Sequence, residues 1–139
     1  MNEYRLSDIS IGLEQSFDVV LDAKMLQSFL EISGDNNPLH TEEEYAKVRG
    51  FKDKVVYGLL TSSFYSTLVG VYLPGKFAIL HGIDIQFLGP VFVGDQLHVY
   101  GVIKYINEAY RQIEVKAHIT NQDNKKVSKA TIKIGLIDE

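Results

Sequence analysis

Residues 58–72 read Gly-Leu-Leu-Thr-Ser-Ser-Phe-Tyr-Ser-Thr-Leu-Val-Gly-Val-Tyr and contain no charged side chain. At helical spacing the large apolar residues cover nearly the whole circumference, and the remaining residues are small. A helix that is apolar on all sides is usually buried in a protein core. The stretch therefore predicts a buried helix that begins at Gly58 and is stopped by Leu73-Pro74-Gly75.

The chain that follows this helix has a period of two, which indicates strands. Apolar and polar residues alternate, and turn residues at Gly89-Pro90 and 121–124 interrupt the pattern. The alternating segments are 83–87, 97–106, 113–119 and 130–136, with an earlier one at 16–21. An antiparallel sheet with one apolar face must cover that face, and only the helix at 58–72 is fully apolar. We therefore predict one α+β domain over residues 1–139, a curved antiparallel sheet wrapped around this helix.

The composition supports one ordinary domain and excludes several classes of function. The 139 residues are 45% apolar and include no cysteine, which removes disulfide scaffolds, cysteine-based zinc sites and thiol nucleophiles. The net charge is −4 and the basic residues are scattered, so we expect no nucleic-acid partner. The polar start at Met1–Arg5 does not resemble a signal peptide, and no apolar run approaches the roughly 18–20 residues of a membrane span. We expect a cytoplasmic protein with no membrane partner.

A polar turn, Ser33-Gly34-Asp35-Asn36-Asn37-Pro38-Leu39-His40, precedes the apolar helix. Upstream of it, apolar residues recur at helical spacing after Asp22, which is a suitable N-cap. Gly34 suits the left-handed residue that commonly ends a helix. The turn is therefore expected to begin where an amphipathic helix ends.

Asp35 and His40 are the two residues of this turn that can carry chemistry. Thr41 and Glu44 form a capping box, which predicts that a helix starts just after His40. A carboxylate and an imidazole on one turn can take a proton from a shared water and deliver one elsewhere, which is the work of a hydratase or dehydratase. The same composition is typical of a structural cap between two helices. The residues alone leave both interpretations open.

Residues 29–46 resemble the signature of the MaoC-like (R)-specific enoyl-CoA hydratase family. The matched positions are Phe29, Ile32-Ser33-Gly34-Asp35, Asn37-Pro38-Leu39-His40 and Ala46. The similarity continues through Val56–Leu60, Ser66, Leu73-Pro74-Gly75 and Pro90–Asp95, and so covers essentially the whole domain. It implies a hot-dog fold, a sheet wrapped around a central helix, in agreement with the periodicity. It also implies a homodimer whose sheets join edge to edge, with pockets at the interface.

The resemblance also assigns roles to individual residues. It implies that Asp35 and His40 are the catalytic dyad that holds the attacking water, and that the backbone N–H of Gly58 receives the thioester oxygen. This N–H suits an oxyanion, because it is an unsatisfied donor at the positive end of a helix dipole. Ser66 matches a polar pocket residue near the dyad, although a small packing residue fits this position equally. Asn37 can bond to nearby backbone or orient one member of the pair.

The sequence departs from the family pattern at Tyr57, where the family commonly has histidine. We interpret Tyr57 as a wall of the substrate pocket, which points to a different acyl group or subfamily. His81 is expected at a strand start, and His98 and His118 on polar, solvated strand faces. No two histidines share metal-ligand spacing, so we predict no metal, and Asp95 is expected to be structural.

The leading hypothesis is an enzyme that reversibly adds water across the double bond of a trans-2-enoyl thioester, giving an (R)-3-hydroxyacyl thioester without a cofactor. One alternative is a dehydratase of the same family that acts on an unusual or carrier-bound acyl thioester. Another is a non-catalytic hot-dog subunit that binds acyl thioesters. The intact pair of Asp35 and His40 favours an enzyme, because a binding subunit gains nothing from a water-activating pair. A hot-dog thioesterase fits less well, because its chemistry does not require this turn.

Overall fold

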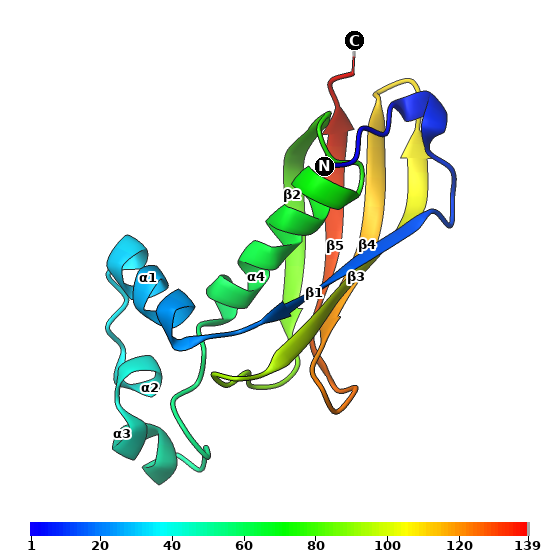
Figure 1. Cartoon of the computed structure of the whole chain (residues 1–139). Helices are drawn as coiled ribbons and strands as arrows, with labels where there is room; N and C mark the ends of the chain where they lie inside the picture. The colour runs from blue at the N-terminus through cyan, green and yellow to red at the C-terminus, as the bar shows by residue number, and fades with distance from the viewer. Residues whose placement is uncertain (139) are drawn as a thin grey trace.

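The computed structural model describes residues 1–138 and is built on a five-stranded antiparallel sheet. The strand order is β1-β3-β4-β5-β2 (Figure 1). The strands are β1 (Glu14–Val20), β2 (Ala78–Phe87), β3 (Gln96–Asn107), β4 (Gln112–Thr120) and β5 (Lys126–Leu136). Helix α4 (Gly58–Thr67) lies across the sheet, which confirms the predicted α+β architecture of a sheet around a central helix.

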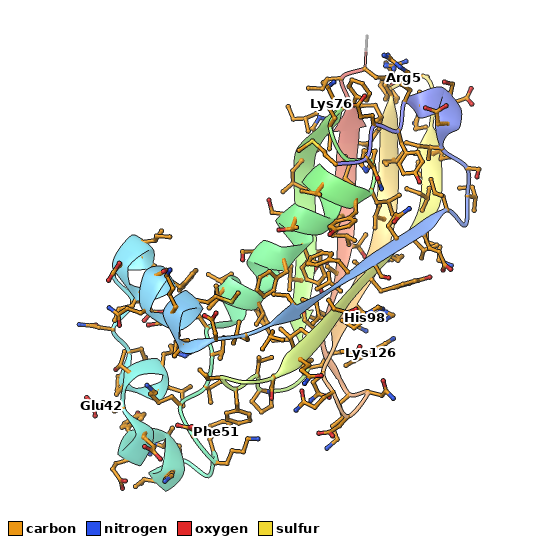
Figure 2. All side chains as sticks on the ribbon, viewed as in Figure 1. Arg5, Glu42, Phe51, Lys76, His98 and Lys126 are labelled. Atoms are coloured by element: carbon orange, nitrogen blue, oxygen red, sulfur yellow. The ribbon has the colours of Figure 1, made fainter. Side chains whose placement is uncertain are left out.

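Three helices between β1 and α4 extend beyond the edge of the sheet (Figure 1). They are α1 (Ala23–Ser33), α2 (Pro38–Thr41) and α3 (Glu43–Val48). Figure 2 places the side chain of Glu42 on this extension, away from the sheet. None of the helices in the described part of the chain is long and apolar enough to span a membrane.

The core lies between α4 and the inner face of the sheet, where side chains fill the space (Figure 2). Alternation along β3, β4 and β5 turns one apolar set toward the helix, as predicted from the period of two. The fully buried set includes Val99, Ile103, Ile113, Val115, Ile119, Ile132 and Ile134, with Tyr65 and Leu68 from the helical side. Each such side chain contributes about 1.5–3 kcal/mol of burial free energy, so this interface is the main source of stability.

Helix α4 is covered on fewer sides than the sequence predicts. Leu59 is 66% exposed, and Ser63 and Ser66 are exposed as well. These residues are spaced so that they share one face of the helix. The prediction of burial on all sides is therefore wrong for this face of the single chain, because the sheet covers only the opposite side. Beyond α4 the helical path continues as a wider π-helical turn over Leu68–Tyr72.

Strand β2 also departs from the expected pattern. Four of its apolar side chains are exposed, Ile79 at 45%, Leu80 at 48%, Ile83 at 39% and Phe87 at 55%, while Ile85 packs against the core. The strand pairs only with β5, so its other edge carries unpaired backbone groups and few covering side chains. Alternation predicted the strand correctly but not the exposure of its apolar face.

The predicted capping box at Thr41 is wrong. Thr41 is the last residue of α2, and its hydroxyl donates to the carbonyl oxygen of Asn37 (3.3 Å). A helix does begin downstream of His40, as predicted, but it is α3 at Glu43, and its N-cap Glu42 makes no side-chain capping bond. The additional short helix α2 starts earlier, where the side-chain oxygen of Asn37 accepts from the N–H of Leu39 (2.9 Å) and Pro38 takes the first helical position. Proline is pre-organised for that position. His40 therefore lies inside α2, a short helix that the sequence did not predict, and just before α3.

Candidate active site

Asp35 is placed by the end of α1. The helix begins as predicted, with Asp22 Oδ1 accepting from the N–H of Met25 (2.8 Å). It ends at Gly34, whose φ of +71° is a left-handed conformation that favours glycine. The exposed Asp35 then accepts a hydrogen bond on Oδ1 from the N–H of Asn37 (3.1 Å). Within residues 1–138, its second carboxylate oxygen has no protein partner.

His40 is held with one ring nitrogen engaged. Its Nδ1 lies 2.6 Å from the carbonyl oxygen of Val55. Because a carbonyl oxygen only accepts, Nδ1 carries the hydrogen, and the neutral ring leaves Nε2 as an acceptor. No ion pair joins this ring to the carboxylate of Asp35 in the described part of the chain. A free acceptor nitrogen is what a general base requires.

Tyr57 lies beneath the turn, where it touches both of the candidate catalytic residues. Its hydroxyl donates a 2.6 Å hydrogen bond to the backbone carbonyl oxygen of Asp35. Its ring centroid is 4.2 Å from that of His40 and 4.7 Å from that of Phe29. The side chain is only 2% exposed, and burial raises the pKa of Tyr57, with the charge of Asp35 adding to the effect. The hydroxyl therefore stays protonated and serves as a donor.

Gly58 begins α4 immediately after Tyr57. As the first helical residue it has no intrahelical acceptor for its N–H, which leaves this donor at the positive end of the helix dipole. Its carbonyl oxygen accepts from the hydroxyls of Thr61 and Ser62, both at 2.8 Å. A Cβ at this position would lie 2.7 Å from Cε1 of Phe87, closer than carbon atoms normally approach. Any larger residue at this position would therefore force the Phe87 ring to move.

Ser66 is the one predicted site residue that the single chain does not bring to the turn. It lies eight residues beyond Gly58, about 12 Å along the helix at 1.5 Å per residue. It is exposed on the same helix face as Leu59. Asn37, the other predicted substrate-binding residue, uses its side-chain oxygen to cap α2, so its side-chain NH2 group remains for other contacts.

The other singled-out polar residues lie away from this cluster. The side chain of His98 is 45% exposed, as predicted, and its Nδ1 bonds to the exposed Asp18 (2.7 Å). His118 is half-buried and stacks on Tyr100 with centroids 4.9 Å apart, so it is less solvated than predicted. Asp95 is buried and accepts from the N–H of Phe92 (3.0 Å), which is a structural role. Within residues 1–138, no group of three or more histidine or acidic side chains could hold a metal ion.

A sequence profile of the MaoC-like domain family matches residues 9–125, which include the whole turn and the start of α4. The chain belongs to this family. The predicted resemblance is therefore confirmed, and so is the hot-dog fold that it implied.

The chain is also similar to individual proteins and solved structures. The (R)-specific enoyl-CoA hydratase of Aeromonas caviae is 35% identical over 89 residues, which is 64% of this chain and 66% of that protein. The 3-hydroxybutyryl-CoA dehydratase of Methylorubrum extorquens is 32% identical over 92 residues, 66% of this chain and 59% of that protein. The matched stretches thus span two thirds or less of these relatives. The solved structure of an unliganded R-hydratase from Pseudomonas aeruginosa has a TM-score of 0.90 at 26% identity, covering 97% of this chain and 86% of that one.

Two groups that contact the site residues of this MaoC-like domain were not identified from the sequence. The carbonyl of Val55 sets the hydrogen position on His40, and the ring of Phe87 lies against Gly58. A backbone contact carries no side-chain signature, and Phe87 follows Gly58 by 29 positions along the chain. Neither contact could be found from spacing or periodicity.

Proposed function

We propose that this MaoC-like domain catalyses the reversible hydration of trans-2-enoyl thioesters, carried by CoA or an acyl carrier, to (R)-3-hydroxyacyl thioesters. One observation carries the proposal. Among residues 1–138, a histidine with a free acceptor nitrogen and an aspartate with a free carboxylate oxygen share one turn, beside an unengaged helix-start N–H at Gly58. The names of the relatives support the same class of reaction.

The roles follow from the chemistry of each group. Nε2 of His40 takes a proton from water as the water oxygen bonds to C3 of the enoyl group, and Asp35 orients the water by accepting its other hydrogen. The electrons of the double bond move onto the thioester, whose enolate oxygen accepts from the N–H of Gly58. The proton then passes to C2, so water is added in full. Dehydration follows the same steps in reverse.

The proposal includes a homodimer joined at the edges of β2. The free edge of this strand and its exposed apolar side chains, such as Ile83 and Phe87, form a surface that a second copy would cover. The exposed stripe of α4 that begins at Leu59 is uncovered in the single chain as well. Because Phe87 lies against Gly58, such an interface would adjoin the proposed oxyanion donor.

The test is a substrate panel. Purified protein is mixed with 2-enoyl-CoA thioesters of short, medium and long acyl chains, and with the matching carrier-protein thioesters, while loss of the conjugated enoyl absorbance is followed. Turnover with formation of the (R)-alcohol, resolved by chiral chromatography, is expected. Turnover of carrier-bound substrates alone would favour the carrier-bound dehydratase. Acyl-CoA binding in calorimetry without turnover of any substrate would refute the proposal and favour the non-catalytic binding subunit.

A further inference from the structure

We infer that Tyr57 is a positioning residue whose hydroxyl fixes the backbone of Asp35 relative to the ring of His40. The inference rests on the proposed function of this pair. It replaces the expected role of Tyr57 as a pocket wall, because a side chain that is 2% exposed beneath the turn offers little surface to a substrate.

The other hydrogen bonds of Asp35 in the described part of the chain join it to its immediate neighbours. Its N–H donates to the hydroxyl of Ser33 (3.1 Å), and its Oδ1 accepts from the N–H of Asn37 (3.1 Å). Both bonds lie within the exposed turn and move with it. The bond from Tyr57 spans 22 positions, and it is the one hydrogen bond recorded within residues 1–138 that ties Asp35 to another part of the fold.

The segment that carries Tyr57 also holds His40. The carbonyl of Val55 accepts from His40 Nδ1, and the N–H of Val55 donates to the carbonyl of Leu39 (3.1 Å). The N–H of Val56 in turn donates to the carbonyl of Val91 (2.8 Å), which anchors this segment to the chain that follows β2.

Residues 55–57 therefore hold both catalytic groups in position. One end of the segment orients the ring of His40 through Val55, and the other end secures Asp35 through the Tyr57 hydroxyl. The Tyr57 ring also lies against the His40 ring and limits its rotation. Two groups that share one water must keep a fixed separation, and a displacement of about 1 Å in such a pair can lower the rate about 100-fold.

Tyr57→Phe tests the inference, because it removes the hydroxyl and keeps the ring. We expect kcat to fall about tenfold while KM stays within about twofold, since the substrate contacts are unchanged. Tyr65→Phe is the matched control. Tyr65 is also buried, and its hydroxyl bonds to Ser128 on β5 (2.9 Å), not to a residue of the turn. The control should lower stability to a similar extent and leave kcat unchanged.

A second measurement separates positioning from a general structural role. In an Asp35→Ala background the carboxylate is absent, so adding Tyr57→Phe should change the residual kcat by less than about twofold. A further tenfold loss in that background would refute action through Asp35. An unchanged kcat in the single Tyr57→Phe variant would refute it as well.

Amide hydrogen exchange tests, without any turnover, whether the hydrogen bond from Tyr57 to Asp35 restrains the turn. Tyr57→Phe should speed exchange at residues 35–37, and Tyr65→Phe should not. If the wild-type chain turns over no enoyl thioester, the proposed function fails, while this exchange result still decides whether Tyr57 holds the turn. Equal exchange in the wild type and in Tyr57→Phe would overturn the inference.

Discussion

The contact between Gly58 and Phe87 leads to a prediction with two separable parts. In Gly58→Ala, the added methyl group would lie 2.7, 3.0 and 3.2 Å from three ring atoms of Phe87. Ordinary carbon contacts lie at about 3.5–4.0 Å, so the ring must retreat by roughly 1 Å. Phe87 is 55% exposed at the end of an edge strand, and its ring has room to move.

The effect on stability follows from two opposing terms. Overpacking of this kind costs about 1–3 kcal/mol, and alanine gains about 1 kcal/mol over glycine in helix propensity, so the free energy of unfolding should fall by about 0–2 kcal/mol. Urea unfolding of Gly58→Ala, Phe87→Ala and the double variant measures the coupling. We expect the double variant to be about 1–2 kcal/mol more stable than the sum of the single changes. If the two single changes in the free energy of unfolding add to within about 0.5 kcal/mol of the double variant, the Phe87 ring does not restrict the size of the residue at position 58.

The effect on activity should be larger. A methyl group beside the Gly58 N–H keeps the thioester oxygen from approaching, and loss of one oxyanion donor lowers kcat by about 10²–10³-fold. Because the methyl group itself is the obstacle, Phe87→Ala should remove the steric overlap in Gly58→Ala but should not restore its kcat. Recovery of kcat in the double variant would refute the role of Gly58 as the oxyanion donor.

Three further predictions concern other parts of the molecule. Asp35→Asn should lower kcat by about 10²-fold or more with little change in KM, and full activity in steady-state assays would remove Asp35 from the mechanism. Ile83→Lys, on the exposed edge of β2, should convert the proposed dimer to a monomer in light scattering. The control Ile11→Lys, at an exposed site outside β2, should leave the protein dimeric. A monomeric wild-type protein would contradict the proposed dimer. Burial lowers the pKa of His118 below 6.5, with the charges of Lys126 and His98 adding to the effect (Figure 2 labels both). As the pH falls below about 6.5 the unfolded chain therefore binds a proton that the folded chain binds less readily, and stability should decline. Lys126→Gln should weaken this decline in urea midpoints measured from about pH 7 to about pH 5, and an identical pH dependence in both proteins would exclude the contribution of Lys126.

Local chemistry made several features predictable. Asp22 caps α1 and Gly34 ends it, because both signals act within one turn of backbone. The alternation after residue 77 predicted β3 and β4 closely, since a strand's side chains must point to opposite faces whatever lies beyond them. The capping signal downstream was misleading. The sequence predicted Thr41 as an N-cap, whereas Asn37 caps α2 and Glu42 precedes α3 without a side-chain capping bond.

The sequence alone predicted the apolar helix at 58–72, the strands around it and the turn that carries Asp35 and His40. The signature in that turn also indicated the family. Tertiary packing alone established that Tyr57 lies beneath Asp35, that Val55 orients His40 and that Phe87 covers Gly58. It also left Leu59 and the edge of β2 uncovered. The physical reason is that periodicity specifies which face of an element is apolar, whereas the group that meets that face depends on how distant segments fold together.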